Sequence, residues 1–413
     1  MPFSENVMML AAEAEAALAQ NFAAIDRMAY ENTCRVMEAF KEERVSDACF
    51  AGTTGYGYDD RGREVLDRVW ARVFDTEAAL VRHNFVNGTH ALSTALFGLL
   101  RPNDTLLAVT GKPYDTLDGV IGIDGANGDG SLADFGVKYD AIEMRDGTID
   151  NDAVCQRVRE DESVRVVFIQ RSKGYQNRRT LTPEEITATY NAVHAVRDNV
   201  YVVVDNCYGE FTCTAEPKAD LLVGSLIKNP GGGMALTGGY LAGSERAVTL
   251  ASYRLTTVGT GGEVGATLGQ NRNMFLGLFY APHTTAAALK TAHLAAYVFE
   301  KMGFLAEPKW SESRADIIQT VVTHSADTLC AFCRGIQAGS PVDAYVEPQP
   351  WAMPGYSDEV IMAAGAFVQG ASVELSADGP IRPPYTVFFQ GGLTYESGKY
   401  GVLTAADYVS KMN

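Results

Sequence analysis

Two side chains that follow neighbouring apolar runs suggest a particular chemistry. Asp205 comes directly after the β-branched run 201–204, and Lys228 comes three residues after Ser225, where a second apolar run ends. Pyridoxal phosphate needs both residue types, because a lysine forms its Schiff base and a carboxylate keeps its pyridine nitrogen protonated. The glycines at 231–233 would let the backbone approach a flat ring closely. The spacing therefore predicts a pyridoxal phosphate site, in which burial and nearby cations lower the pKa of Lys228.

Further residues that follow apolar runs would complete this site. Residues 88–90 (GTH) begin an apolar helix, whose amino-terminal amides and positive dipole end would bind a phosphate. Tyr114 lies in a loop rich in Gly and Pro, where its ring would stack on the cofactor or simply pack. Arg171 follows another apolar run. The alternative is a set of ordinary strands that end in polar residues, with Lys228 in solvent.

The elements that must position these residues are predicted to form one sheet. Helices separate several of the strands, and this alternation predicts a mostly parallel α/β sheet with right-handed crossovers. Ligands bind outside the carboxyl ends of the strands in such sheets, which is where the chemically suggestive residues lie. The seven strands are expected at 83–86, 105–109, 137–142, 164–170, 201–205, 220–224 and 239–243.

The segments on either side of this sheet have different compositions. Residues 4–44 are predicted to be helical, because Ala, Glu, Leu and Met dominate and no Gly or Pro intervenes. The loop 50–63 (FAGTTGYGYDDRGR) carries Tyr and Arg side chains that would reach into a site or remain in solvent. Helices are expected at 64–74, 182–197 and 282–302, and strands at 372–375 and 385–389 in a smaller carboxyl-terminal part.

Two other patterns resemble known motifs but lack the required context. The glycine-rich stretch 256–269 has neither the spacing nor the strand–turn–helix context of a dinucleotide-binding fingerprint. Cys330 and Cys333 form a single CxxC in an apparently helical segment, so the default interpretation is two cysteines on a buried helix face. No phosphate loop and no HExxH are present, and no metal site is predicted.

Composition narrows the partners and the compartment. The 413 residues include 34 basic and 51 acidic side chains, for a net charge of −17, which argues against nucleic acid or an anionic membrane as a partner. Seven scattered cysteines, an odd number, argue against a disulfide framework. No signal peptide is apparent, and no apolar run approaches the ~18 residues that a membrane span requires. We therefore expect a cytoplasmic enzyme with a small-molecule substrate.

Five segments together resemble the methionine γ-lyase-related group of fold-type I pyridoxal-phosphate enzymes, near the cystathionine lyases, whose members are often labelled "aluminium resistance protein". The resemblance implies a large α/β domain with a mostly parallel seven-stranded sheet and flanking helices, and a smaller α+β domain. It places an arm and inter-subunit loop at 1–63, the cofactor-binding domain at 64–275 and the small domain at 276–413. The segments are 205–211 (DNCYGEF), 228–233 (KNPGGG), 88–91 (GTHA), 111–116 (GKPYDT) and 390–395 (QGGLTY).

The resemblance also implies roles for individual residues. Lys228 matches the Schiff-base lysine, Asp205 matches the partner of the pyridine nitrogen, and Tyr114 matches the tyrosine stacked on the ring. The phosphate ligands would be Gly88, Thr89, His90 and Ser225.

The loop that bears Tyr56, Tyr58 and Arg61 resembles the segment that such lyases lend to the phosphate of a neighbouring subunit. The related lyases carry Tyr-x-Arg there and this chain has Tyr58-x-x-Arg61, so either tyrosine would be the counterpart. The protein is therefore expected to be a homodimer or homotetramer with shared sites.

The implied activity is the cleavage of a carbon–sulfur bond in a sulfur amino acid of the cystathionine or methionine type. The products would be a 2-oxo acid, ammonia and a thiol, and both β- and γ-elimination remain open. Arg382 and Arg171 are candidates for the substrate carboxylate, since a guanidinium group binds carboxylates with two prongs. The alternatives are aldol cleavage, decarboxylation, transamination or a non-catalytic relative that binds the cofactor or an amino acid.

Overall fold

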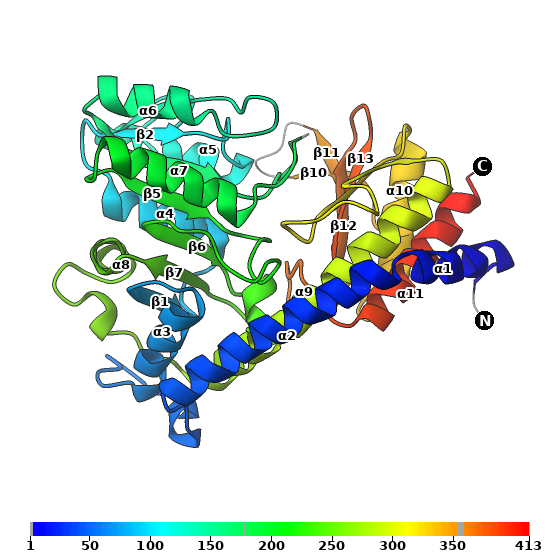
Figure 1. Cartoon of the computed structure of the whole chain (residues 1–413), viewed down its shortest axis with the longest axis horizontal. Helices are drawn as coiled ribbons and strands as arrows, with labels where there is room; N and C mark the ends of the chain where they lie inside the picture. The colour runs from blue at the N-terminus through cyan, green and yellow to red at the C-terminus, as the bar shows by residue number, and fades with distance from the viewer. Residues whose placement is uncertain (1–2, 177, 354–357, 413) are drawn as a thin grey trace.

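The chain forms two lobes that share one pair of long helices. The computed structural model describes residues 3–176, 178–353 and 358–412. Figure 1 shows a large lobe built on one sheet and a smaller lobe built on a second sheet. The helices α2 (Ala19–Glu42) and α9 (Asn271–Lys301) lie side by side and extend from one lobe to the other. The predicted boundary at 275/276 falls inside α9, which is continuous.

The large lobe contains the predicted mostly parallel sheet of seven strands, in the order β1-β7-β6-β5-β4-β2-β3. β7 alone is antiparallel to its neighbours. Both β5 and β6 therefore end at the same edge of the sheet. The strands are β1 (Ala78–Arg82), β2 (Thr105–Ala108), β3 (Lys138–Ala141), β4 (Val164–Gln170), β5 (Tyr201–Asp205), β6 (Leu221–Ser225) and β7 (Gly239–Gly243).

The first strand lies earlier in the chain than predicted. Leu80 pairs with Leu241 of β7, and the strand has ended by His83. The expectation of a strand at 83–86 is wrong, because these residues form the turn that leads to the helix α4 (Gly88–Leu99). Phe85 is fully buried in this turn, so its apolar character reflects packing rather than a strand.

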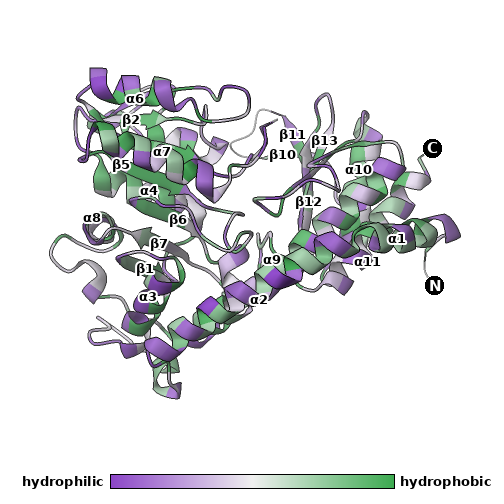
Figure 2. Cartoon of the chain, in the orientation of Figure 1, coloured by the Kyte–Doolittle hydropathy of each residue, from purple (hydrophilic) through white to green (hydrophobic). Residues whose placement is uncertain are grey.

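Helices cover both faces of the large sheet and explain its uninterrupted apolar strands. In β5, Val202 and Val204 face one buried cluster, and Val203 faces another on the opposite side. Figure 2 shows the resulting hydrophobic strands inside the lobe, with hydrophilic residues on the outer helices. The covering helices are α3 (Arg61–Val73), α4, α6 (Asn151–Glu160), α7 (Pro183–Val196) and α8 (Glu245–Leu255).

The helix α7 begins as its sequence predicts. The Thr182 hydroxyl accepts from the Glu185 backbone amide, the Glu185 side chain accepts from the Thr182 amide, and Pro183 is the first helical residue. This capping box satisfies backbone donors that a helix end leaves unpaired.

The small lobe is an antiparallel sheet in the order β10-β11-β12-β13-β9-β8, packed against α1 (Glu5–Ala17), α10 (Ala326–Ala338) and α11 (Tyr395–Ser410). Cys330 and Cys333 are buried on α10, as predicted. The prediction of a strand at 372–375 is wrong except for Leu375, because residues 372–374 form a turn, whereas the strand predicted at 385–389 begins one residue later, at Thr386. The strands are β8 (Leu305–Glu307), β9 (Gln319–Val322), β10 (Trp351–Ala352), β11 (Glu359–Ala363), β12 (Leu375–Pro380) and β13 (Thr386–Gly391).

The amino-terminal helices are confirmed, and each has its own packing partner. α1 packs into the small-lobe core through Val7, Ala11 and Ala14, whereas α2 lies along α9. α9 begins eleven residues before the predicted start at Pro282, which lies inside the helix. Near its start, a Cβ on Gly277 would come within 2.4 Å of the Gly231 carbonyl oxygen, so this glycine allows α9 to approach the loop that follows Lys228.

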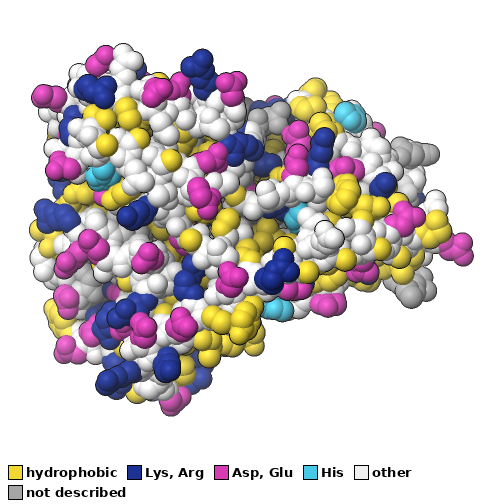
Figure 3. All heavy atoms as spheres, in the orientation of Figure 1, with side chains coloured by type: hydrophobic (Ala, Val, Ile, Leu, Met, Phe, Trp, Pro, Cys, Tyr) yellow, Lys and Arg dark blue, Asp and Glu magenta, His cyan; other side chains and the backbone are white. Residues whose placement is uncertain are grey.

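Surface charge is mixed over the face shown in Figure 3, where acidic and basic side chains are interspersed. Among the helices that the structure describes, none has the length and apolar composition needed to cross a membrane.

Candidate active site

The structure brings the predicted lysine and aspartate together at the carboxyl edge of the large sheet. Asp205 ends β5, Ser225 ends the adjacent parallel strand β6, and Lys228 precedes the short helix η4 (Asn229–Gly231). One cavity at this edge is lined by Gly88, Thr89, Tyr114, Asp205, Ser225 and Lys228. A neighbouring cavity shares Tyr114, Asp205 and Lys228 and extends to the small lobe.

Lys228 lies over an aromatic ring in a turn that the next residue, Asn229, holds in place. The Lys228 amine lies 4.2 Å from the centre of the Tyr208 ring. Tyr208 has a backbone φ of 72°, a left-handed conformation that is uncommon for a residue other than glycine. The buried Asn229 side chain donates to the carbonyl oxygens of Tyr208 (2.9 Å) and Glu210 (3.0 Å) and so holds this turn against the lysine loop.

The charge environment of Lys228 differs from the prediction. Burial by itself lowers the pKa of Lys228, but the acidic groups of Cys207, Tyr208 and Asp205 outweigh burial and raise this pKa above its ordinary value. The expected lowered pKa is therefore wrong for this arrangement, because acids rather than cations face the amine. Burial raises the pKa of Asp205, and the charge of Lys228 opposes that rise.

The residues at this edge fit pyridoxal phosphate. The Ser225 hydroxyl is buried and has no hydrogen-bond partner among the described residues, as expected of a group that awaits a ligand oxygen. A Cβ on Gly88 would lie 3.4 Å from the Ser225 Cβ and 3.5 Å from the Cys207 sulfur, so glycine keeps this corner open. Gly88 also begins the twelve-residue helix α4, whose first amides have no partner within the helix.

The His90 side chain is not part of this corner. Its Nδ1 accepts from the Val86 amide at 3.1 Å, and its ring packs edge-on against Phe85. The His90 backbone amide donates to the Asn87 side chain at 2.8 Å. His90 lines neither cavity, so of the predicted phosphate turn the structure brings Gly88 and Thr89 to the site.

Neither arginine predicted to bind a substrate carboxylate reaches the cavities. Arg171 is fully buried and donates to Asn206 Oδ1 (2.8 Å) and Glu216 Oε2 (3.1 Å). It points away because side chains alternate along an extended segment, and its neighbours Gln170 and Ser172 line the cavity instead. Arg382 pairs with Asp358 at 2.8 Å on the surface and lines neither cavity.

The predicted loop 50–63 ends earlier than expected, because Arg61 already begins α3, and residues 52–63 lie outside the cavities of their own chain. Tyr56 and Tyr58 are 76% and 57% exposed, and their rings stack 5.6 Å apart. Arg61 is exposed as well. Arg63, in contrast, is buried and donates to the carbonyl oxygens of Gly57 and Gly265, so it pins this loop to the glycine-rich stretch 256–269.

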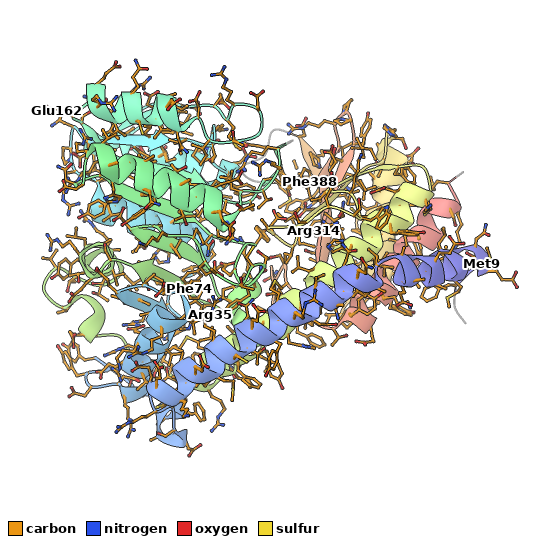
Figure 4. The ribbon with its side chains drawn as sticks, viewed as in Figure 1. Met9, Arg35, Phe74, Glu162, Arg314 and Phe388 are labelled. Carbon is orange, nitrogen blue, oxygen red and sulfur yellow. The ribbon has the colours of Figure 1, made fainter. Side chains whose placement is uncertain are left out.

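The second wall of the site comes from residues that the sequence did not single out. The Tyr175 ring lies 4.8 Å from the Phe388 ring, and Figure 4 places Phe388 where the small lobe faces the large one. Arg178 donates to the carbonyl oxygens of Gln170 and Ser172 and stabilises this wall. Tyr175 follows a strand and Gln390 begins the segment 390–395 that carries the family resemblance, so both had a usable signal, whereas β12 carries no local pattern that marks a site. The added lining residues are Gln170, Ser172, Gly174, Tyr175, Cys207, Tyr208, Ile318, Asp378, Phe388 and Gln390.

With this geometry in place, comparison with known proteins identifies the family. The methionine gamma-lyase profile matches residues 7–410. The chain belongs to the methionine gamma-lyase family. The protein YnbB of Bacillus subtilis is 49% identical to this chain over 401 residues, which cover 96% of this chain and 95% of that protein.

Solved structures extend this relationship. A protein from Clostridium novyi, described as a carbon-sulfur lyase involved in aluminum resistance, is 48% identical with a TM-score of 0.95, over 100% of this chain and 97% of that chain. The pyridoxal-5'-phosphate-dependent protein YhfS of Escherichia coli is 16% identical with a TM-score of 0.61, over 92% and 95% of the two chains. At that identity the likeness to YhfS concerns the fold alone.

Proposed function

We propose that this member of the methionine gamma-lyase family is a pyridoxal-phosphate-dependent carbon–sulfur lyase of fold-type I architecture. It would cleave a sulfur amino acid of the cystathionine or methionine type to a 2-oxo acid, ammonia and a thiol. The observation that carries the proposal is that one cavity brings together Asp205, which ends β5, with Ser225 and Lys228, at and just beyond the end of the adjacent parallel strand β6. The Ser225 hydroxyl there has no hydrogen-bond partner among the described residues. The family match and the name of the Clostridium novyi relative support it.

Each cofactor group would have a residue to hold it. The Lys228 amine would attach the cofactor covalently, and the Asp205 carboxylate would pair with the ring nitrogen. Ser225, Gly88 and Thr89 would receive the phosphate. When bound, pyridoxal phosphate accepts the electron pair left at the substrate Cα.

The protein side chains would then move the protons. Once the substrate amine has displaced Lys228, the lysine amine would be the base that removes the Cα proton. This role requires the neutral amine, so the loaded site would have to lower the raised pKa that the surrounding acids alone give Lys228. Asp205, as a buried carboxylate, would keep the ring nitrogen protonated so that the electron pair is stabilised. The sulfur leaves from Cβ or Cγ as a thiolate and takes up a proton, for which the Tyr114 hydroxyl in the same cavity is the candidate donor.

We further propose that two subunits complete each site. The exposed Tyr56, Tyr58 and Arg61 do not line the cavities of their own chain, although their residue types suit a phosphate and a flat ring. A two-fold axis would place both loops on the partner sites at once. The Arg63 contacts keep the loop ordered while these three side chains point outward.

Product analysis tests the activity. Purified protein loaded with pyridoxal phosphate is incubated separately with cystathionine, methionine, cysteine and homocysteine, and thiol (or hydrogen sulfide), ammonia and 2-oxo acid are measured. We expect equal amounts of the three products from at least one substrate. A 2-oxo acid that forms without ammonia would indicate transamination, and bound cofactor without any product would indicate a non-catalytic relative; either result rejects the lyase proposal.

A further inference from the structure

A carboxyl group from the small lobe lies in the same cavity as the lysine. Asp378 is on β12, and it lines this cavity together with Asp205, Tyr208 and Lys228. In the β12–β13 pair Asp378 is opposite Phe388, which also lines the cavity. The lysine end of the cavity therefore belongs to the large lobe, and an acid marks its other wall.

Asp378 is half-buried, and its carboxyl group has few partners for one that faces the interior. Its Oδ1 is buried without a hydrogen-bond partner among the described residues. Burial raises the pKa of Asp378 to about 7, and a hydrogen bond with Tyr175 partly opposes that rise. No ion pair joins it to a Lys, Arg or His side chain of the part of the chain that the structure describes.

A buried acid of the same lobe shows what a structural role looks like. Glu374 accepts from the backbone amides of Phe367 (2.7 Å) and Val368 (2.8 Å), one on each carboxyl oxygen. No backbone amide of the described residues donates to Asp378, and the ring pair of Tyr175 and Phe388 lies on its side of the cavity. A buried carboxyl oxygen without a hydrogen bond, such as Asp378 Oδ1, is costly unless a ligand supplies the missing partner.

We propose that Asp378 binds a positively charged group at the distal end of the substrate side chain. The preferred substrates would then be sulfur amino acids that carry a second ammonium group beyond the sulfur, rather than methionine-like thioethers. The inference rests on the proposed function in treating the bound amino acid as a substrate. The recognition of an ammonium group by Asp378 does not depend on it.

The chemistry of the wall suits such a group. An ammonium offers three donors and a charge to a carboxylate, which makes the hydrogen bond charge-assisted. The rings of Tyr175, Tyr208 and Phe388 attract a cation through their faces and also contact sulfur favourably. A substrate without the ammonium would leave Asp378 Oδ1 without a hydrogen-bond partner, so the site would discriminate against it.

Binding of amino acids that cannot be cleaved tests the recognition directly. The holoenzyme is titrated by calorimetry with L-lysine and with L-2-aminoheptanoate, which has a methyl group in place of the terminal ammonium. We expect wild type to bind lysine about 10- to 100-fold more tightly. Asp378→Asn should bring the two affinities close together by weakening lysine alone. The control Asp327→Asn, at an exposed acid in the first turn of α10, should keep the wild-type ratio.

Several outcomes would overturn the inference. Equal affinities in the wild type, or a preference that survives in Asp378→Asn, exclude recognition of the ammonium by this carboxyl. An equal loss of both ligands would assign Asp378 a structural role. Should Asp378→Asn fail to fold, as judged by its thermal transition, Asp378→Ser replaces it and must show the same selective loss.

The lyase reaction separates this inference from the proposed function. S-(2-Aminoethyl)-L-cysteine and S-propyl-L-cysteine have side chains of the same size and differ by the ammonium. If neither compound releases a thiol while the preference for lysine persists, the lyase proposal is rejected and the recognition by Asp378 still stands. Faster release from the propyl compound in wild type would reject the substrate class proposed here.

Discussion

The two walls of the candidate site are built in opposite ways. The large-lobe wall is centred on a short stretch of chain, in which Asp205 and Ser225 end two adjacent strands and Lys228 follows the second one. The small-lobe wall comes from β12 and β13, about 150 residues further along, and reaches the cavity because the two lobes pack together. The first wall is ordered by the sheet itself, whereas the second depends on how one lobe is placed on the other.

The two walls would also contribute differently to the proposed function: the large-lobe wall would hold the cofactor, and the small-lobe wall would select the substrate side chain. The large-lobe wall contains the residues that suit the cofactor, and the Asn229 side chain holds the turn of Tyr208 and Glu210 against the lysine loop. The small-lobe wall contributes Asp378, Phe388 and Gln390, which suit a substrate side chain. Because one fold serves many reactions through its site residues, the second wall is where relatives with the same cofactor would diverge.

Replacing the lysine breaks the large-lobe wall most completely. Lys228→Ala removes the group that would hold the cofactor and move the Cα proton, so kcat should fall by at least on the order of 10³-fold. Borohydride reduction of wild type followed by peptide mass spectrometry should find the cofactor mass on the peptide that contains Lys228. Lys218→Ala, at an exposed lysine, is the control and should keep full activity. Cofactor fixed to another lysine would refute the assignment.

The second largest effect is expected at the aspartate of the same wall. Asp205→Asn keeps the volume but removes the charge that would pair with the ring nitrogen, so kcat should fall by about 10²- to 10⁴-fold. Cofactor affinity, measured by equilibrium titration of apoenzyme, should change much less. Asp146→Asn is the matched control, because Asp146 is exposed in a left-handed turn (φ 51°) that asparagine also tolerates. Near-normal kcat in Asp205→Asn would make this acid structural.

Mixing two defective variants tests whether the loop of a partner subunit completes the site. Arg61→Ala and Lys228→Ala subunits are each expected to be poorly active, measured at limiting cofactor. If the loop serves the partner, a hybrid dimer has one intact site, and random association should restore about a quarter of wild-type activity. If each loop serves its own chain, both sites of every dimer remain defective. Activity after mixing that does not exceed the average of the two variants would therefore reject the shared site.

The smallest effect is expected outside both walls. Arg382→Ala removes an exposed pair with Asp358, so the free energy of unfolding should fall by less than about 1 kcal/mol. Since Arg382 lines neither cavity, kcat/KM should stay within about twofold of wild type. A tenfold or larger rise in KM with unchanged kcat would instead return Arg382 to the substrate carboxylate and extend the small-lobe wall to the lobe surface.

The sequence by itself determined six of the seven strands of the large sheet, all but β1, and the wall that they order. The apolar runs at β4, β5 and β6 are long and unbroken, so their strand character and their polar ends are visible locally. Parallel strands align those ends at one edge, which is why Asp205, Ser225 and Lys228 were recognisable without coordinates. The capping residues of α7 are equally local.

Only the tertiary structure decided which side chains face the cavity. Arg171 and Gln170 are adjacent in sequence, yet one is paired with Glu216 away from the cavity and the other lines the site. The pKa of Lys228 is raised rather than lowered because the fold gathers acids around the amine. Asp378 reaches the same cavity from the other lobe across a long separation in sequence. No periodicity of β12 predicts this position, because lobe packing depends on many weak contacts spread over the whole chain.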